Sequence, residues 1–245
     1  MKNEKVLLIL LMILVFTINY KFIDSFLIKT FQDYEVGIVE RIIDGDTVIV
    51  NGTSVRLLGI NSPERGEIGY IEAKDFLEKE ILNKKIKIYF GKDKFDRYRR
   101  KLGYIFLDSE NINLKSVREG YSNFYFPSGK DKYYNQFVNA WGECLEEGLN
   151  LCEKSLEHCI ILKEWNINEQ IVILENICNR EIDLVGWSVK DEGRKKYVFE
   201  EETLKKFEEV VLGVEKWGKD YVWTKSGDSI FVRDSENKLV IFDSY

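Results

Sequence analysis

Histidine is nearly absent from this 245-residue sequence: His158 is the single one, and only two prolines are present. One imidazole excludes metal centres built from several histidines, and it argues against Ser-His-Asp hydrolysis. His158 adjoins Cys159, and the sequence contains no C-x-x-C pair, so zinc-finger spacing is also missing. We interpret His158 as a surface or linker residue, and expect charged side chains to carry any chemistry.

The composition, with 44% hydrophobic and 13% aromatic residues, excludes wholesale disorder. The net charge is -6, and most of the acidic excess lies in residues 156–245, which disfavours nonspecific nucleic-acid binding there. In contrast, Lys84–Lys101 holds nine basic residues against two acidic ones. This basic band fits either a polyanion-binding surface or a solvated lysine-rich hairpin.

The N-terminus combines a short basic segment, Met1–Lys5, with an apolar run, Val6–Ile18. The run alone covers about two thirds of a ~30 Å hydrocarbon core, and the amphipathic Phe22–Phe31 extends it. No small-residue cleavage site follows, so residues 1–31 predict an uncleaved membrane signal anchor, with a buried N-terminal helix as the alternative. We expect a single-pass cell-membrane protein whose remaining residues lie outside the cytoplasm.

The four cysteines lie in the second half of the chain, where an exported protein would form disulfides: Cys144, Cys152, Cys159 and Cys178. Four cysteines allow three complete pairings, and their spacing does not select one.

Residues 32–155 predict a mixed α+β domain. Five strands are expected, with one helix between the third and fourth and two helices after the fifth. The strands are Val36–Ile43, Thr47–Val50, Ser54–Ile60, Lys85–Phe90 and Leu102–Leu107, and the helices are Tyr70–Leu82, Asn111–Glu119 and Asp131–Glu147. This order predicts a small Greek-key barrel capped by helices.

Residues 156–245 predict a separate all-β domain. Short β-like runs recur between turn signals such as Glu192-Gly193, a pattern typical of an antiparallel sandwich. The runs are Glu169–Leu174, Val185–Lys190, Lys196–Phe199, Glu208–Gly213, Asp228–Asp234 and Leu239–Ser244.

Three segments of the first domain carry chemistry-bearing residues: Ile43-Asp44-Gly45-Asp46-Thr47, Arg56-Leu57-Leu58-Gly59-Ile60-Asn61-Ser62-Pro63-Glu64 and Asp96-Arg97-Tyr98-Arg99-Arg100-Lys101-Leu102-Gly103-Tyr104. An Asp-Gly-Asp turn alone is common, but its combination with the arginines and the glutamate is not. In order and spacing, the three resemble the signature segments of staphylococcal nuclease-like (thermonuclease) proteins. The resemblance covers residues 35–150 and implies Ca²⁺-dependent hydrolysis of phosphodiesters in DNA and RNA on an OB-fold barrel.

The resemblance also implies roles for individual residues. Asp46, Asn61 and the main-chain carbonyl of Ser62 would be ligands of Ca²⁺, a hard cation that prefers oxygen. Arg56 and Arg100 would clamp the scissile phosphate, where guanidinium groups stabilise the charge of the transition state. Glu64 would activate or position the attacking water, a task that a carboxylate can perform.

Two departures from the family pattern affect these roles. Asn61 stands where the family commonly has Asp, so weaker Ca²⁺ affinity or altered metal choice is predicted, whereas Ser62 for Thr should change little. Arg99 stands where the family usually has Gly; either arginine could be the clamp, although Arg100 matches by position. Asp44 would hold either a metal-bound water or only the turn.

Aromatic and basic residues near these segments predict a nucleic-acid surface. Tyr98 and Tyr125 are expected to stack on bases, and Arg99 and Lys101 to contact the substrate. For the cluster Tyr121, Phe124, Tyr125 and Phe126, we expect at least half of the side chains to be core.

The C-terminal segments Ile171–Asn176, Asp183–Val189 and Val222–Ile230 resemble a lamin-tail domain, an immunoglobulin-like sandwich without catalytic activity. The resemblance leaves its partner unknown. We expect Trp187 and Trp223 to be packing residues. A second metal site is disfavoured, and turn or edge positions are expected for Asp183, Asp228 and Asp234.

The leading hypothesis is therefore a membrane-anchored, externally facing nuclease. Two alternatives remain: a catalytically silent OB-fold nucleic-acid-binding protein that cannot hold its cation because of Asn61, and a surface adhesion protein. The joint presence of Asp46, Arg56, Glu64 and Arg100 favours the enzyme.

Overall fold

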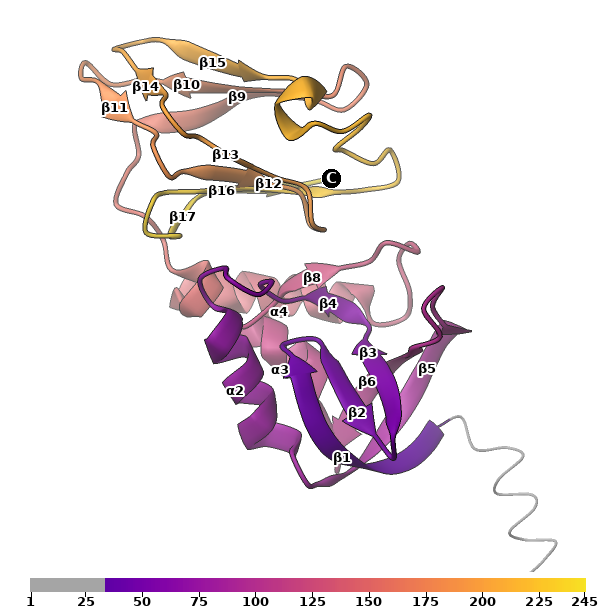
Figure 1. Cartoon of the computed structure of the whole chain (residues 1–245). Coiled ribbons are helices and arrows are strands. Elements are labelled where there is room, and N and C mark those ends of the chain that lie inside the picture. The colour runs from indigo at the N-terminus through magenta and orange to yellow at the C-terminus, as the bar shows by residue number, and fades with distance from the viewer. Residues whose placement is uncertain (1–33) are drawn as a thin grey trace, which may run out of the picture. The chain divides into compact units, whose positions relative to one another are not determined.

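The computed structural model describes residues 34–245, and Val36–Tyr245 form one compact unit (Figure 1). The predicted signal anchor, residues 1–31, lies outside the described residues. Within residues 34–245, no helix combines the length and the apolar character that crossing a membrane requires.

The first half of this unit is a β-barrel with helices, as the sequence predicts. Its sheet has the order β3-β2-β1-β5-β6-β7, and an additional pairing of β3 with β6 closes it. The strands are β1 (Tyr34–Asp44), β2 (Thr47–Val50), β3 (Thr53–Leu57), β5 (Lys85–Phe95), β6 (Lys101–Leu107) and β7 (Glu110–Asn111). The closing pair is parallel, with Arg56 opposite Leu102, whereas the pairs β1–β2, β2–β3, β5–β6 and β6–β7 are antiparallel. β1, β2, β3, β5 and β6 thus form a five-stranded, OB-like barrel.

The prediction of one strand over Ser54–Ile60 is wrong, because the chain turns after Leu57. Gly59 has φ 76°, and a Cβ there would lie 3.0 Å from the Phe137 ring, so glycine suits this position. The chain then forms β4 (Gly59–Asn61), which pairs with β8 (Asn123–Tyr125) instead of continuing β3. The turn places Asn61 outside the barrel sheet.

Three helices lie beside the barrel strands (Figure 1), and their buried apolar side chains belong to the barrel core. The predicted helices are confirmed as α2 (Tyr70–Ile81), α3 (Ile112–Arg118) and α4 (Tyr134–Glu147). Buried Leu77 and Ile81 of α2 and Phe137 and Trp141 of α4 contribute to one core cluster. Full burial of side chains of this size stabilises the fold by roughly 1.5–3 kcal/mol each.

The C-terminal half is β-rich, and its sheets share a second core. The sheet orders are β15-β10-β9, β11-β14 and β13-β12-β16-β17. The strands are β9 (Ile160–Asn166), β10 (Ile171–Asn176), β11 (Ile182–Asp183), β12 (Ser188–Lys190), β13 (Lys196–Val198), β14 (Thr203–Leu204), β15 (Glu209–Leu212), β16 (Ser229–Arg233) and β17 (Leu239–Ser244), with 3₁₀ turns η1 (Asn150–Cys152) and η2 (Val214–Trp217). Trp187 and Trp223 are 5% and 1% exposed, which confirms their packing role.

The sequence reading missed β9, and the strand register explains the omission. Glu164 lies opposite Ile173, and Leu162 lies opposite Leu174, so Lys163 is an extra residue at a bulge. This bulge interrupts the alternation of apolar and polar residues by which a strand is recognised.

The four cysteines form two disulfides, Cys144–Cys152 and Cys159–Cys178. The first joins the end of α4 to η1, and the second joins the chain before β9 to the chain after β10. His158 is exposed, as expected for a surface residue.

The three C-terminal aspartates lie at turns and edges, as predicted. Asp183 ends the edge strand β11 and accepts from the Val185 backbone N–H at 2.9 Å. Asp228 accepts from the Thr224 backbone N–H at 3.0 Å, and Asp234 accepts from that of Lys238 at 2.9 Å.

Apolar side chains connect α4 to the last two strands. The Trp141 ring centroid lies 5.6 Å from the centroids of both Phe231 of β16 and Phe242 of β17. Phe231 and Leu239 belong to the same buried cluster as the barrel core. Residues on the two sides of the predicted domain boundary near residue 155 therefore pack against each other through apolar side chains.

Candidate active site

The acidic turn between β1 and β2 carries Asp44 and Asp46. The backbone N–H of Asp46 donates to Asp44 Oδ1 at 3.0 Å, which closes the turn. A Cβ at Gly45 would lie 2.7 Å from the Ser62 Cβ, so glycine permits the segment after β4 to approach the turn. Burial, followed by the neighbouring Asp46 charge, raises the pKa of Asp44 above its usual value.

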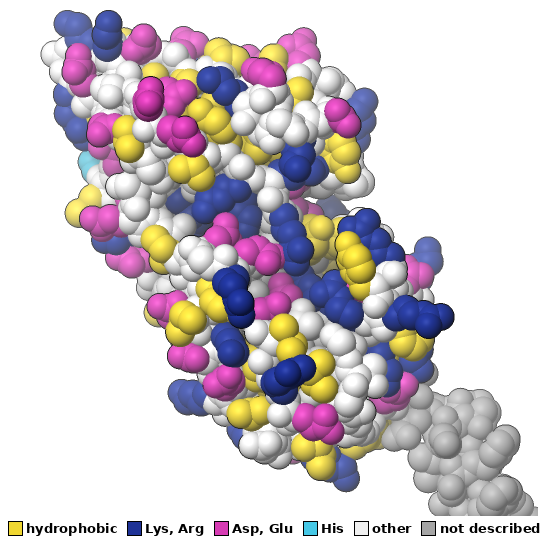
Figure 2. Space-filling model, in the orientation of Figure 1, with side chains coloured by type: hydrophobic (Ala, Val, Ile, Leu, Met, Phe, Trp, Pro, Cys, Tyr) yellow, Lys and Arg dark blue, Asp and Glu magenta, His cyan; other side chains and the backbone are white. Residues whose placement is uncertain are grey.

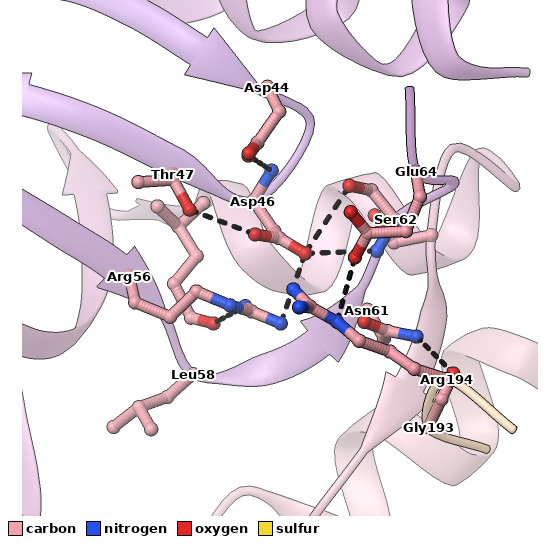
Figure 3. A network of polar contacts seen from close by, with 12 residues as sticks. Asp44, Asp46, Thr47, Arg56, Leu58, Asn61, Ser62, Glu64, Gly193 and Arg194 are labelled. Carbon is pink, nitrogen blue, oxygen red and sulfur yellow. Dashed lines mark hydrogen bonds and ion pairs between the residues drawn. The ribbon is translucent and has the colours of Figure 1, made fainter. Parts of the chain in front are cut away.

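Asp46 and Arg56 form a buried ion pair at the centre of the site (Figure 3). Arg56 Nη2 lies 3.0 Å from Asp46 Oδ2, and Arg56 Nη1 donates to the Leu57 carbonyl. The β2–β3 register produces this pair, because Thr47 lies directly opposite Arg56. The Ser62 backbone N–H and hydroxyl also donate to Asp46 Oδ2, at 3.2 and 3.3 Å. Two predicted site residues, Arg56 of β3 and Ser62 just after β4, thus contact the carboxylate of Asp46, which precedes β2.

Asn61 turns its amide toward the C-terminal half. Its Nδ2 donates to the Gly193 carbonyl at 2.7 Å and to the Glu192 carbonyl at 3.4 Å. Its Oδ1 is buried and has no hydrogen-bond partner. An aspartate could not make these donations, so the departure from the family pattern has a structural use here.

Glu64, the predicted water activator, is exposed beside this contact. Its Oε1 lies 2.7 Å from Arg194 Nε of the loop between β12 and β13 (Figure 3). The sequence reading missed Arg194 and Gly193, because Glu192-Gly193 indicated only a turn.

Arg100 immediately precedes β6, and the β3–β6 register places it two residues before Leu102, the partner of Arg56. Its side chain pairs with Asp96: Arg100 Nε lies 2.7 Å from Asp96 Oδ2. The pKa of Asp96 is lowered; partial burial would raise it, but hydrogen bonds from the side chain and backbone of Arg100 outweigh burial. The described contacts therefore place Arg100 near the strand end that bears Arg56, with a carboxylate partner of its own.

Three of the four predicted nucleic-acid-binding residues lie around the β5–β6 turn, which also bears part of the basic band, and the fourth, Tyr125, lies on β8. Tyr98 is 65% exposed, and the guanidinium carbons of Arg97 and Arg100 lie 4.8 and 5.6 Å from its ring centroid. Arg99 is exposed with φ 63°, a left-handed conformation that favours the glycine usual in the family. Lys101 is the first residue of β6 and is partly buried.

Of the second aromatic cluster, Phe124 is 3% exposed, and Tyr121 stacks on Phe76 with ring centroids 4.6 Å apart. Phe124 is a core residue, and Tyr121 and Phe126 are partly buried and pack against the same core, as expected for at least half of the cluster. Tyr125 is half-buried and lines a cleft of about 350 Å³ to which Arg194, Lys195 and Tyr245 also contribute.

The cleft is also lined by carboxyl groups whose pKa is raised above the ordinary value. Burial, together with the charge of Asp228, raises the pKa of Glu192 to about 8. Burial raises the pKa of Asp191 to about 6, with Asp228 again contributing. Acidic side chains therefore line this cleft together with Arg194, which is exposed.

The donor set of the site consists of oxygen atoms, which suits a hard cation. Residues 34–245 contain no cluster of three or more acidic, His or Cys side chains in metal-binding geometry. Amide and carbonyl oxygens would have to complete the coordination, and the buried acceptor Asn61 Oδ1, which lacks a partner, is suited to that. The residues present therefore fit Ca²⁺, with Asp46 as the carboxylate ligand and with fewer negative charges than an acidic cluster would supply.

A five-stranded OB-like barrel with a buried carboxylate–arginine pair at its acidic turn and an exposed glutamate beside it indicates a class of phosphodiester hydrolases. Residues 54–154 match the family described as Staphylococcal nuclease homologue. The chain is 30% identical to the Thermonuclease of Staphylococcus intermedius over 127 residues, 48% of this chain and 76% of that protein. It is 35% identical to the Thermonuclease of Staphylococcus hyicus over 112 residues, 42% of this chain and 66% of that protein.

A third relative, Endonuclease YhcR of Bacillus subtilis, is 32% identical over 129 residues, which are 44% of this chain and only 10% of that protein. The chain belongs to the staphylococcal nuclease homologue family. It is a thermonuclease-like hydrolase of phosphodiester bonds.

Proposed function

We propose that this protein is a Ca²⁺-dependent nuclease that cleaves DNA and RNA. The observation that carries the proposal is the buried Asp46–Arg56 ion pair. Ser62 also donates two hydrogen bonds to Asp46, and Glu64 is the first exposed residue after Ser62 along the chain. A pure binding surface has no need for a buried acid–arginine pair beside an accessible carboxylate.

Each residue has a role that its position supports. Arg56 and Arg100 bind the scissile phosphate and stabilise the charge that develops on its oxygens. Glu64 accepts a proton from the attacking water, because it is the exposed carboxylate of this group. Asp46, Asn61 and the Ser62 carbonyl would hold Ca²⁺, which supplies additional stabilisation of phosphate charge when bound. Around the site, Tyr98, Arg99, Lys101 and Tyr125 contact the flanking nucleotides.

We extend the proposal to location and to the C-terminal half. Residues 1–31 anchor the protein in the cell membrane, with the nuclease outside the cytoplasm. Two disulfides support an oxidising compartment for residues 34–245. The C-terminal half is proposed to be an immunoglobulin-like sandwich of the lamin-tail type, since its three resembling segments fall on β10, on β11 with β12, and on the approach to β16.

The test is hydrolysis of single-stranded DNA and of RNA by the full-length protein in detergent, measured as release of acid-soluble nucleotides. Glu64→Gln and Arg100→Ala should each lower turnover by at least about 100-fold, since general-base catalysis alone contributes roughly 10²–10⁴-fold. Glu72→Gln, an exposed α2 residue, is the matched control for Glu64→Gln. EDTA should abolish hydrolysis and Ca²⁺ should restore it; full activity in EDTA or in Glu64→Gln would contradict the assigned mechanism.

One observation favours a second candidate, a nucleic-acid-binding protein without turnover. Asn61 replaces an acidic ligand, and its Nδ2 is committed to the carbonyls of Glu192 and Gly193. Tight binding of single-stranded DNA with no nucleotide release in Ca²⁺, Mg²⁺ or Mn²⁺ would support this candidate over the enzyme.

A further inference from the structure

The loop between β12 and β13, residues 191–195, approaches the nuclease site from the C-terminal half of the chain. Asn61 Nδ2 donates to the Gly193 carbonyl, and Asn123 Nδ2 donates to the Glu192 carbonyl at 3.0 Å. Two residues of β4 and β8 therefore hold consecutive carbonyls of this loop.

The loop is also fixed from within. The backbone N–H of Lys195 donates to Asp191 Oδ1 at 2.8 Å, and the backbone N–H of Asp191 donates to the Lys195 carbonyl at 3.0 Å. The backbone N–H of Glu192 donates to Asp228 Oδ1 at 3.3 Å. Arg194 therefore lies on a turn whose backbone is held by these hydrogen bonds. The position of the turn, and not only the ion pair, places the guanidinium near Glu64.

The three arginines at the site differ in accessibility. Arg56 is 8% exposed and is committed to Asp46 and the Leu57 carbonyl. Arg100 is partly buried against Asp96. Arg194 has a side chain 63% exposed, and its partner Glu64 is 47% exposed. An ion pair this exposed contributes roughly 0–1 kcal/mol, so exchange of Glu64 for a phosphate costs little.

The same side of the C-terminal half presents further cations to the loop that bears Glu64. Lys196 Nζ lies 3.3 Å from Glu67 Oε1. The pKa of Glu67 is lowered; burial would raise it, but the charges of Lys190 and Lys196 and a hydrogen bond from the Glu64 backbone outweigh burial. Figure 2 shows Lys and Arg side chains gathered around a hollow in the molecule. Although the C-terminal half is acidic in total, Arg194 and Lys196 thus place two cations beside the loop that bears Glu64 and Glu67.

We propose that Arg194 is a substrate-binding residue of the nuclease site, which binds a phosphate of the nucleic-acid strand adjacent to the scissile one. The planar guanidinium suits bidentate binding of a phosphate. This role in substrate binding rests on the proposed function, but binding of a phosphate by Arg194 does not require hydrolysis.

The amide of Asn61 is needed for this arrangement, because its Nδ2 donates to the carbonyls of Glu192 and Gly193. A carboxylate at this position would face two carbonyl oxygens, which would repel it and release the loop that carries Arg194. The contact spans 132 residues of sequence, so it joins the C-terminal half to the nuclease site directly.

The experiment measures affinity of the full-length protein in detergent for a fluorescent single-stranded DNA oligonucleotide, by anisotropy, with EDTA present throughout. Arg194→Ala should weaken binding about 5- to 10-fold at low salt. It should also reduce the slope of log affinity against log salt by about 0.7, the value for one phosphate contact on a single strand. Arg194→Lys should retain part of the affinity, because it keeps the charge and loses the planar fork.

Arg180→Ala is the matched control. Arg180 is also an exposed arginine of the C-terminal half, 58% exposed, whose Nη2 lies 2.7 Å from Glu157 Oε2. It should leave both affinity and salt slope unchanged. Equal effects of Arg194→Ala and Arg180→Ala would overturn the proposal, and so would faster turnover in Arg194→Ala with unchanged affinity, since Arg194 would then only block Glu64.

Hydrolysis kinetics separate this proposal from the proposed function. Arg194→Ala should raise KM about 5-fold or more and leave kcat within about 2-fold. If Glu64→Gln is inactive while Arg194→Ala matches Arg180→Ala, only the role of Arg194 fails. If the wild-type protein binds without turnover and Arg194→Ala loses affinity, only the enzymatic function fails.

Discussion

Asp46, in the turn before β2, and Arg56 of the adjacent strand β3 form a buried ion pair, with Asp46 Oδ2 and Arg56 Nη2 3.0 Å apart. Asp46 is 3% exposed and also accepts hydrogen bonds from Thr47 and Ser62, so its charge is balanced by protein groups rather than by water. The arginine proposed to bind phosphate therefore also has a structural role.

Arg56→Ala should lower both turnover and stability. Removal of one partner leaves the Asp46 carboxylate buried without its countercharge, which costs about 3–5 kcal/mol of unfolding free energy. Arg56→Lys should recover part of the stability but little of the turnover, because a lysine lacks the bidentate fork. Urea unfolding and nucleotide release on the same preparations measure the two effects, and equal recovery of both would contradict the assignment.

Arg99→Gly should retain most of the turnover. Arg99 has φ 63°, a conformation that costs a non-glycine residue about 1–2 kcal/mol, and Arg100 is the arginine held by Asp96. The release of strain is offset in part by the greater freedom of glycine in the unfolded chain, so stability should change by less than about 1 kcal/mol. Loss of turnover in Arg99→Gly with normal turnover in Arg100→Ala would make Arg99 the clamp.

Asp191→Asn should remove one contribution to stability that weakens as the pH rises from 4 to 7. Burial raises the pKa of Asp191 to about 6 from an ordinary 3.8, so the folded state binds this proton more tightly than the unfolded state. The resulting stabilisation is present below about pH 3.8 and disappears as the pH rises to about 6. Its size is about 2–3 kcal/mol, measured as the difference between wild type and variant in urea unfolding at the two pH values. Parallel pH profiles for the two proteins would contradict the shift.

Each disulfide should contribute measurably to stability. The separations of 8 and 19 residues between paired cysteines correspond to about 2–4 kcal/mol per bridge in the loop-entropy treatment. Ser substitution of both members of one pair, followed by urea unfolding, measures each contribution. Peptide mapping under non-reducing conditions checks the pairing, and a Cys144–Cys159 peptide would contradict it.

The sequence alone determined the main chemistry of this protein. Asp46, Arg56, Glu64 and Arg100 lie in short segments whose order and spacing are read directly along the chain. The barrel followed from the same local patterns, since turns at Asp44-Gly45 and Asn51-Gly52 set the first hairpins. The prediction of secondary structure was wrong at the turn of Gly59 and missed β9 at the bulge of Lys163, where a local rule was broken, and it also missed the short strands β7, β8, β11 and β14.

Only the tertiary structure decided how the C-terminal half relates to the site. The partners of Asn61 and Glu64 lie more than 100 residues away, and no local pattern encodes a hydrogen bond to the Gly193 carbonyl or an ion pair to Arg194. The choice among three disulfide pairings likewise depends on which cysteines the fold brings together. Local composition determines turns, strands and motif residues, whereas contacts between distant segments arise from the packing of the two cores.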